Sequence, residues 1–366
     1  MGSEFTIREL NEEDFFDPLL LSPSAPFTQS DEYRKWQKGL EREVKRFLIE
    51  QGGLVLGFFQ TIKFELPFGK SYIYSPYGPI LKINTLDSNG RNELLSYLKK
   101  YLLELYRHSN VVFVRLDFTL TSENKNISSG DADYFHHSQK YFKRAPKSTY
   151  LGAYFQPRQE WFLDITPPEG NLLKAAHEKT RYLIGLAGRK GIETEIVESN
   201  FKNYFEQFYS LLSGTAERNG FSLHPKTYYE HIFGCIEKNP INPDFRFQAY
   251  LSIAKYDGEI LVMNLIVRYG NVAHFIFGGS SDAHRNLSPS HLAQWAAIVH
   301  AKKIGAKSYN FGGISADDGT HKSWDGLSSF KKKFGGHAVS HEHTYDLVIK
   351  RFWYTLYVFR KVLKSR

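Results

Sequence analysis

The stretch DGEILVMNLIV at residues 257–267 decides the fold, because it opens a series of elements that the chain contains twice. Asp-Gly is typical of a turn, and the apolar run after it indicates a buried strand. A second strand, AHFIF at residues 273–277, stops at two glycines, and the strand AKSYNF at residues 306–311 closes the series. Between these two strands we expect a helix whose apolar face contains Leu292, Trp295, Ala296 and Val299.

The same order of elements occurs about 200 residues earlier in the chain. GLVLGFF at residues 53–59 and SYIY at residues 71–74 are expected strands, and VVFVRLD at residues 111–117 closes this first series. Two matching series favour duplicated α/β domains, although α/β chains can also alternate in this way by coincidence. The helix of the first series has apolar side chains at helical spacing, namely Leu94, Leu98, Leu102 and Leu105.

Helical sequence is expected ahead of each series. In the first half it covers residues 31–49. In the second half it covers residues 170–190, 200–220 and 225–238.

The seam between the two domains is expected near PKS at residues 146–148, after the polar stretch 123–133. The last segment, residues 345–366, has no place in the second series, and we expect it to be a helix that packs on the first domain. The first domain then comprises residues 1–147 and 345–366, and the second comprises residues 148–344.

Composition limits the classes of protein and partner. The 366 residues include 47 Lys and Arg against 39 Asp and Glu, and the net charge of +8 favours an anionic partner such as phosphate, nucleic acid or an acidic lipid surface. The single cysteine, Cys235, excludes a disulfide framework within the chain and a zinc site built on cysteines. No apolar run approaches the ~20 residues of a membrane span, and residues 2–6 lack the features of a secretion signal. We therefore expect a cytoplasmic protein.

The segment FKKKFGG at residues 330–336 has two interpretations. Trp324 and Leu327 stand at helical spacing from Phe330 and Phe334, which predicts a buried apolar face with the three lysines on other sides. One interpretation is a solvated basic helix end, stabilised by the helix dipole and a glycine cap. The other is that one lysine turns into a cleft and meets negative charge there.

The segment RLD at residues 115–117 also has two interpretations. Alternation along the strand places Arg115 and Asp117 on one face, and strand ends in α/β sheets commonly border ligand clefts. The same residues could form a structural ion pair or cap a turn. The nearby turn YSPYGP at residues 74–79 is more typical of a structural corner than of a ligand platform.

Other motifs give weaker signals. The glycines within residues 185–191 lie in a helical run rather than after a strand, which favours a basic helix with a glycine cap and, secondarily, contact with nucleic acid. HEH at residues 341–343 with Asp346, and HH at residues 136–137, lack a firm ligand spacing, so we expect no metal site. The sequence has no Gly-x-Ser-x-Gly elbow of a serine hydrolase, and Cys235 falls in a predicted helix without an obvious base.

The last segment, residues 345–366, combines apolar and basic side chains. Docking on the first domain explains the apolar face, while a basic amphipathic helix also allows contact with an anionic membrane. The residues concerned are Phe352, Trp353, Leu356, Phe359 and Leu363, with Lys350, Arg351, Arg360, Lys361, Lys364 and Arg366.

A set of short motifs, taken in order, resembles the Fem family of peptidoglycan aminoacyltransferases (FemA, FemB and FemX). The match extends over most of the chain, and the ordered set is more specific than any single piece. The pieces are Thr28-Gln29, Tyr74 with Gly78-Pro79, RLD at 115–117, QPR at 156–158, LDI at 163–165, AERNG at 216–220, QWA at 294–296, FGGI at 311–314, and Phe330-Lys331 with Phe334-Gly335.

The resemblance implies two tandem GNAT-like domains with mixed sheets, with a C-terminal helix that returns to the first domain. The long helical hairpin of larger members is absent, so the chain resembles the compact type. Members of the family move an amino acid from aminoacyl-tRNA to an amine on the stem peptide of a peptidoglycan precursor. Because the tRNA ester is already activated, no cofactor is required. We expect a monomer that uses charged tRNA and a nucleotide-linked or lipid-linked precursor, with peripheral contact to the inner membrane.

The resemblance also implies roles for single residues. Lys331, with Phe330 beside it, matches the family lysine that contacts the ester carbonyl, where a cation stabilises the developing negative charge. Asp117 matches an acidic residue near the acceptor, where it would orient the ammonium group or accept a proton. The expected residues of the acceptor cleft are Gln29, Tyr74 and Arg115.

Some positions depart from the compact members. His224 stands where those members have an arginine for the diphosphate of the precursor. Near the position of their second phosphate-binding lysine, the nearest lysines are Lys35 and Lys38. Phe275 and Phe277 replace tyrosines. These departures favour a lipid-linked acceptor, or a different acceptor, over a nucleotide-linked one. The candidates for tRNA contact are Lys179, Arg181, Lys332 and Lys333.

Two other functions compete with this hypothesis. An acyl-CoA-dependent N-acyltransferase would use one of the two domains, but Tyr182 stands where an arginine or glutamine would begin the acetyl-CoA loop before Gly185. A non-catalytic binder of nucleic acid or of a membrane surface would rely on the positive net charge.

Overall fold

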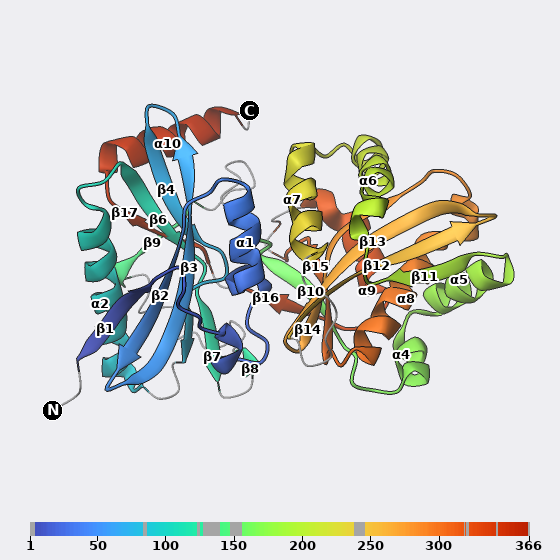
Figure 1. Ribbon diagram of the computed structural model, residues 1–366, viewed down its shortest axis with the longest axis horizontal. Coiled ribbons are helices and arrows are strands. Elements are labelled where there is room, and N and C mark those ends of the chain that lie inside the picture. Colours follow the sequence, from blue (N-terminus) through green and yellow to red (C-terminus); the bar gives the residue numbers. More distant parts are fainter. Residues whose placement is uncertain are drawn as a thin grey trace. The chain divides into compact units, whose positions relative to one another are not determined.

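The computed structural model describes residues 4–82, 86–122, 125–126, 140–146, 156–237, 246–317, 319, 322–341 and 343–364. The chain forms two compact units (Figure 1). The first comprises Met1–Gln159, Ala316–Lys322 and Ser340–Arg366, and the second comprises Glu160–Ser315 and Ser323–Val339. Each unit has its own mixed sheet, which confirms the expected pair of α/β units. None of the helices among these residues is both long and apolar enough to span a bilayer.

The elements of the first unit alternate between strands and helices. Along one path its sheet has the strand order β8-β7-β5-β3-β4-β6-β17-β9, and β2 pairs with both β1 and β3. The strands are β1 (Phe5–Leu10), β2 (Val44–Gln51), β3 (Leu54–Leu66), β4 (Lys70–Ser75), β5 (Ile80–Lys82), β6 (Val111–Leu116), β7 (Thr119–Ser122), β8 (Lys125–Asn126), β9 (Lys143–Arg144) and β17 (Tyr345–Val348), and the helices are α1 (Asp31–Gly39), α2 (Ser88–Tyr106) and α10 (Arg351–Lys364).

The sheet of the first unit splits beside the long strand β3. One part of β3 pairs with β4, and an earlier part pairs with β5. The split continues in the next strands, because β6 runs parallel to β4 while β7 runs parallel to β5. The links 76–79 and 117–118 connect the two parts, and the N–H of Asp117 donates to the carbonyl of Ser75 at 3.3 Å. Asp117 therefore lies where the strands diverge.

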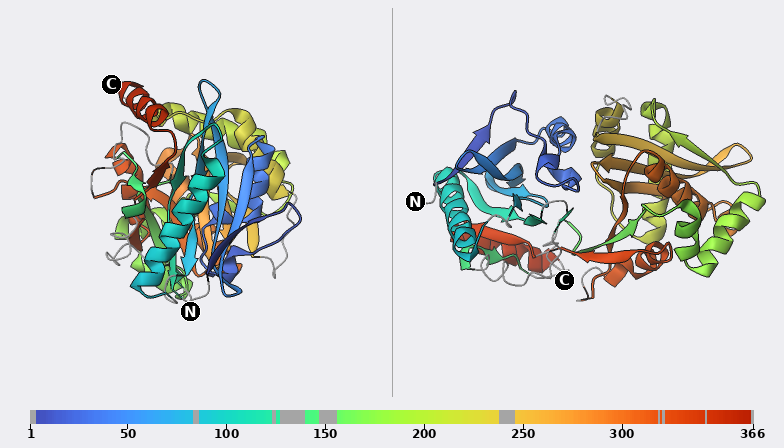
Figure 2. Two further views of the ribbon diagram at one scale, coloured as in Figure 1. Left: turned by 90° about the vertical axis from the view of Figure 1, so that its left-hand side faces the viewer. Right: turned by 90° about the horizontal axis from the view of Figure 1, so that it is seen from below.

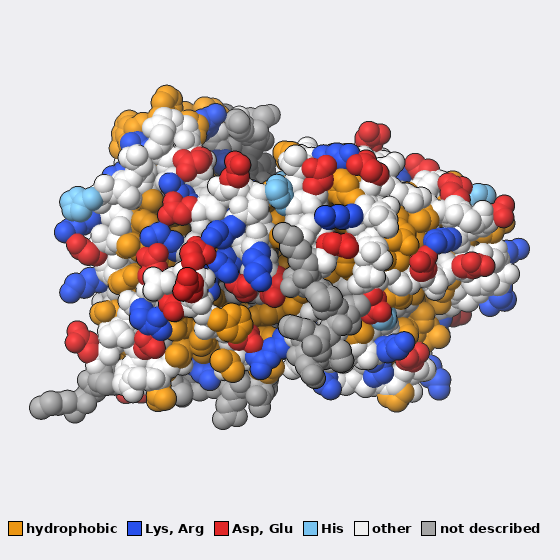
Figure 3. Space-filling model, viewed as in Figure 1, with side chains coloured by type: hydrophobic (Ala, Val, Ile, Leu, Met, Phe, Trp, Pro, Cys, Tyr) orange, Lys and Arg blue, Asp and Glu red, His pale blue; other side chains and the backbone are white. Residues whose placement is uncertain are grey.

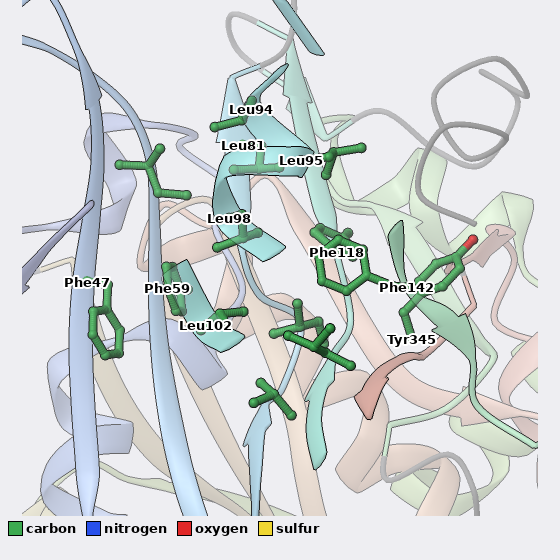
Figure 4. Close-up of a cluster of buried hydrophobic side chains, with 14 of the residues drawn as sticks. Phe47, Phe59, Leu81, Leu94, Leu95, Leu98, Leu102, Phe118, Phe142 and Tyr345 are labelled. Carbon is green, nitrogen blue, oxygen red and sulfur yellow. The ribbon is translucent and has the colours of Figure 1, made fainter. Parts of the chain in front are cut away.

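Helix α2 covers one face of this sheet (Figure 2, left view). Its buried leucines pack against Phe47 and Phe59 of the sheet, as the close-up shows (Figure 4). Helix α10 packs elsewhere, because Tyr354 belongs to a cluster with Tyr72 and Phe113. Since neighbours along a strand point to opposite faces, β4 and β6 supply side chains to both clusters.

Two helices expected in this unit are shorter than the sequence predicted. The helix expected over 31–49 ends at Gly39, where Glu41 adopts a left-handed conformation (φ 58°), and 44–51 form strand β2. That strand buries Phe47 and Ile49, two residues apart on one face. The helix expected over 345–366 also begins with a strand, because Tyr345–Val348 pair with β6 and β9.

The second unit has the strand order β11-β12-β13-β14-β15-β10-β16. The strands are β10 (Gln159–Asp164), β11 (Glu193–Val197), β12 (Phe247–Tyr256), β13 (Glu259–Tyr269), β14 (Val272–Ser280), β15 (Ser308–Ile314) and β16 (His337–Ser340), and the helices are α4 (Glu169–Ala175), α5 (Glu178–Arg189), α6 (Phe205–Asn219), α7 (Lys226–Glu237), α8 (Pro289–Lys303) and α9 (Asp325–Lys332).

The repeated series predicted from the sequence is present in both units. In the first, β3 and β4 are antiparallel, and β6 follows α2 to run parallel to β4. In the second, β13 and β14 are antiparallel, and β15 follows α8 to run parallel to β14. The two units thus share an antiparallel pair, a helix and a parallel strand.

The side chains predicted for the apolar face of α8 are not the most buried ones of that helix. The most buried side chains include Ala293, Ala297 and Ala301, whereas Leu292 and Trp295 are only partly buried. Alanines allow a helix to approach a sheet closely, and hydrophobic periodicity gives little weight to such small residues, which here are buried together with Gln294 and Ile298. The helix expected over 170–190 is two helices, because the chain bends after α4 and His177 caps α5 by accepting the N–H of Lys179.

Candidate functional site

The first candidate centre surrounds Asp117, directly after strand β6. Its carboxylate is buried and accepts a hydrogen bond from the Thr344 hydroxyl at 2.6 Å. The Tyr74 hydroxyl donates to the other carboxylate oxygen. Tyr74 lies on β4, parallel to β6, and Thr344 directly precedes β17. Strands that are far apart in the sequence thus converge on one carboxylate.

Burial raises the pKa of Asp117 above its ordinary value, although the hydrogen bonds from Thr344 and Tyr74 act in the opposite direction. Burial, together with the negative charge of Asp117, raises the pKa of Tyr74 well above its usual value, so the tyrosine stays protonated as a donor. A buried carboxylate with a raised pKa can accept a proton or bind an ammonium group, provided that a polar partner reaches it.

Gln29 shapes the corner next to Asp117. Its side-chain nitrogen donates to the carbonyl of Pro76 at 2.7 Å, and its oxygen accepts the N–H of Gln60 at 2.8 Å. Gly78 has no room for a side chain, because a Cβ there would lie 2.4 Å from the Ser75 hydroxyl and 2.7 Å from the Gln29 nitrogen. The structure therefore places Gln29 as a support of the corner rather than as a solvent-exposed contact.

Arg115 forms the structural ion pair that the sequence left open. Its Nε and Nη2 atoms each donate to Asp346 at 2.8 Å, and both side chains are fully buried. The Tyr354 hydroxyl of α10 also donates to Asp346 at 2.8 Å. The Asp346 carboxylate raises the pKa of Arg115 against the effect of burial. The guanidinium thus joins β6 to β17, and the expected role of Arg115 in the acceptor cleft stays a prediction.

The second candidate centre surrounds Lys331 in the other unit. Helix α9 turns Ser328, Lys331 and the following Phe334 inward, whereas Leu327 is 50% exposed. The predicted face of α9 is confirmed at Phe334 and Phe330 but is wrong at Leu327, and Lys331 lies on the buried side. Its Nζ atom donates to the carbonyl of Gly313 at 2.6 Å. The functional interpretation of a lysine turned inward fits this geometry better than a solvated helix end.

A chain of hydrogen bonds holds the partner of Lys331. Gly312 adopts a positive φ of 77° and donates its N–H to the Asn310 side-chain oxygen at 2.7 Å. The Asn310 nitrogen donates to Glu160 at 3.1 Å and lies 3.4 Å from Nδ1 of His274. Strands β10, β14 and β15 therefore contribute a buried polar cluster beside the lysine.

Lys331 loses its proton more easily than an exposed lysine does. Burial lowers its pKa to about 8, and the negative charge of Glu160 partly opposes this effect. Burial also lowers the pKa of His274 to about 4, so the imidazole is neutral near pH 7. An ammonium group has three N–H donors, and the Gly313 carbonyl uses one of them. Lys331 is thus a poorly hydrated cation that can donate to an oxygen that becomes negative.

Phe330 packs beside this centre. Its ring centroid lies 5.2 Å from that of Phe334 and 5.1 Å from that of His291. These contacts support the end of α9, and a direct role in the reaction stays a prediction.

The residues expected to bind the precursor lie in two places. Lys35 pairs with Asp31 at 2.9 Å, and Lys38 pairs with Glu12 at 2.8 Å, in the first unit. In the second unit the remaining candidates are aromatic. His224 stacks on Tyr228 at 4.1 Å, Phe277 packs edge-on against Tyr229 at 5.2 Å, and Phe275 is partly buried in a neighbouring cluster.

The expected tRNA contacts cluster in part. The N–H of His177, at the start of α5, donates to the carbonyl of Lys333 at 2.8 Å, which brings α5 and the end of α9 together. Lys179 and Lys333 both act to lower the pKa of His291, after burial. Arg181 instead donates to the carbonyl of Lys174 at 3.1 Å, and Lys332 lies over the Trp161 ring at 5.6 Å. In this structure Arg181 therefore caps the C-terminal end of α4.

Glu160, His274, Asn310 and Thr344 were missed by the sequence analysis. Two of them carried a usable signal, because His274 and Asn310 are polar residues inside apolar strands. Glu160 lies near the start of β10 and Thr344 directly precedes β17. Neither residue is enclosed by an apolar strand sequence that would mark it as buried. Among the described residues no cluster of metal ligands occurs; Glu342 and the pair 136–137 lie outside them.

Comparison with known proteins places the chain among related sequences. The FemAB family profile matches residues 15–240 and 246–361. A lipid II:glycine glycyltransferase of Staphylococcus epidermidis is 20% identical over 370 residues, and the match covers 85% of each chain. A UDP-N-acetylmuramoylpentapeptide-lysine N(6)-alanyltransferase of Weissella viridescens is 22% identical over 327 residues and covers 86% of each chain. A shorter match, to the lipid II:glycine glycyltransferase of Staphylococcus saprophyticus, is 24% identical and spans 60% of that relative.

Solved structures show the same fold. The crystal structure of FemX superposes with a TM-score of 0.74 at 18% identity and covers 95% of this chain and 99% of that one. A tandem GNAT protein from the clavulanic acid biosynthesis pathway gives a TM-score of 0.54 at 12% identity, over 94% of this chain and 99% of that one. The expected tandem GNAT-like architecture is thereby confirmed.

Proposed function

The chain belongs to the FemAB family and is an aminoacyltransferase, and from this premise we propose that it transfers an amino acid from an aminoacyl-tRNA to the stem peptide of a peptidoglycan precursor. The names of two relatives support the acceptor, since one acts on lipid II and the other on a UDP-linked pentapeptide lysine. The buried ammonium of Lys331 is the observation that carries the proposal.

The reaction converts an ester into an amide. The acceptor nitrogen attacks the ester carbonyl, the carbonyl oxygen becomes negative, and the ribose oxygen of the tRNA leaves. The neutral amine nitrogen loses one proton as the amide forms, and the leaving ribose oxygen gains one. No external energy source is required, because an ester is less stable than an amide. Much of the rate then depends on holding the amine against the carbonyl.

Lys331 fits the part of oxyanion donor. Its ammonium group lies on the buried side of α9. One of its three N–H groups donates to the Gly313 carbonyl, which leaves two for the substrate oxygen. Poor hydration strengthens its interaction with an oxygen that gains negative charge in the transition state. Its pKa of about 8 leaves it mostly protonated at pH 7.

Asp117 fits the part of acceptor-side carboxylate. A primary amine on the stem peptide is protonated at neutral pH and must lose that proton before it attacks. Because burial raises the pKa of Asp117, its carboxylate is a better proton acceptor than an exposed aspartate. Tyr74 and Thr344 fix the orientation of both oxygens.

A lipid-linked precursor is the acceptor that this chain's residues favour. Lys35 and Lys38 are already paired with Asp31 and Glu12, and His224 replaces the expected arginine. At these positions the cations expected to bind the UDP group of a nucleotide-linked precursor are therefore paired with carboxylates or replaced. We place the reaction at the cytoplasmic face of the membrane, where charged tRNA and such a precursor can meet.

The decisive experiment offers a set of charged tRNAs with lipid-linked and nucleotide-linked precursors, and mass spectrometry identifies the product. Lys331→Ala should slow transfer about 10²–10³-fold, as expected for the loss of one oxyanion donor. Lys303→Ala is the matched control, because that lysine of the same unit is exposed, is not among the candidates for tRNA contact and should change the rate little. If both variants transfer at the wild-type rate, the assignment of Lys331 is wrong; if the wild type transfers no amino acid from any charged tRNA, the proposed donor is wrong.

A further inference from the structure

Helix α10 has two apolar faces, and only one of them packs against the sheet of the first unit. Trp353, Tyr354, Tyr357 and Val358 pack with the sheet cluster that contains Tyr72 and Phe113. A second set is spaced four, three and four residues apart, which aligns it as a stripe along the helix. The stripe consists of Phe352, Leu356, Phe359 and Leu363.

The exposed stripe continues onto a hairpin. Phe68, at the turn between β3 and β4, packs its ring 5.8 Å from that of Trp353. A pocket of about 270 Å³ lies between this turn and α10, and its lining includes Phe68, Trp353 and Leu356. Phe68 and the four residues of the stripe, here called the docking patch, are 41% to 77% exposed. They lie at the end of the first unit that carries α10, where apolar side chains gather in Figure 3.

The described residues that line the pocket beside the docking patch include three cations and no carboxylate. Lys70, Arg360 and Lys361 line the same pocket, and Lys70 lies over the Trp353 ring at 5.0 Å. The sequence after Asp346 contains no Asp or Glu but six Lys and Arg residues. A second copy of this chain would bring like charges together in a symmetric contact, so self-association is disfavoured.

We propose that the docking patch binds the first unit to an anionic phospholipid bilayer, with the apolar side chains at the acyl boundary and the cations among the headgroups. The combination of an apolar stripe with flanking Lys and Arg matches such a surface in both polarity and charge. The proposal does not depend on the proposed function, because a bilayer without any peptidoglycan precursor would suffice for binding.

The test uses the whole chain and vesicles free of precursor. Co-sedimentation should show binding to vesicles that contain phosphatidylglycerol, weaker binding to pure phosphatidylcholine, and a loss of binding at high salt. The double variant Phe352→Ser/Phe359→Ser should bind at least about tenfold more weakly, since each change removes a large apolar side chain from the contact. Both residues are exposed, so the thermal midpoint should stay at the wild-type value.

Matched controls distinguish the docking patch from a general effect of exposed apolar side chains or of net charge. Leu54→Ser removes an exposed apolar side chain at the other end of β3, roughly 40 Å along the strand from Leu66, and should leave binding unchanged. Arg360→Glu should weaken binding at least about fivefold, whereas Lys190→Glu, with the same change in net charge on an exposed residue of the other unit, should not.

Three results would overturn the proposal. The first is equal binding of the wild type to neutral and anionic vesicles, or no binding to either. The second is wild-type binding by both the Phe352→Ser/Phe359→Ser and the Arg360→Glu variants. The third is a dimer in solution that these changes dissociate, which would assign the docking patch to a second copy of the chain.

Discussion

Lys331 depends on Glu160 for part of its charge, and this dependence can be measured. Glu160 raises the pKa of Lys331, so the change Glu160→Gln should let burial lower that pKa further below about 8. The fraction of cationic Lys331 would then fall at a lower pH than in the wild type. We expect the alkaline decline of kcat/KM to move to lower pH, with transfer several-fold slower at pH 8.

The matched control for this prediction is Glu193→Gln, which removes an exposed carboxylate from the same unit. Its pH profile should coincide with that of the wild type. An unchanged pH profile for Glu160→Gln would show that the charge of Glu160 does not raise the pKa of Lys331.

Single residues were only partly readable from the sequence. Lys331 and Asp117 were selected through the resemblance, whereas spacing alone placed Lys331 on the wrong side of α9. Glu160 is brought to Asn310 by the pairing of distant strands, and a linear sequence does not show which strands become neighbours.

Strand β17 is joined to β6 by a buried ion pair as well as by backbone pairing. Its Asp346 holds Arg115 of β6 inside the first unit, with both groups out of solvent. Asp346→Ala should cost about 3–5 kcal/mol of stability, because it leaves a buried guanidinium without its carboxylate. Urea unfolding followed by circular dichroism measures this loss.

Glu206→Ala is the control for Asp346→Ala, since Glu206 forms an exposed ion pair with Lys226. It should leave the unfolding midpoint unchanged. Equal midpoints for both variants would mean that the β17 pair contributes no more than a surface contact.

The elements themselves were predicted well where periodicity was strong. The strands of the two series and helices α2, α6 and α7 follow from apolar spacing. The predictions missed where two elements share one apolar run: residues 31–49 hold α1 and β2, and residues 345–366 hold β17 and α10. A short strand and a helix both favour apolar residues, and only pairing with β6 decides that Tyr345–Val348 is extended.

At the scale of the whole molecule, the two candidate centres belong to different units. Asp117 lies in the first and Lys331 in the second. If both serve one reaction, their losses should not multiply, because residues that act as a unit are strongly non-additive. In a cycle of Asp117→Asn, Lys331→Ala and the double variant, we expect kcat/KM of the double variant to fall little below that of the worse single variant. Fully multiplicative losses would instead mean that the two residues act independently.

The return of the chain end to the first sheet affects how the protein is made. Strand β17 lies between β6 and β9, and it is translated only after the entire second unit. While the ribosome synthesises that unit, β6 lacks its neighbour on one side and Arg115 has no carboxylate. Until residues 345–348 have been synthesised, the first sheet therefore keeps an open edge at β6.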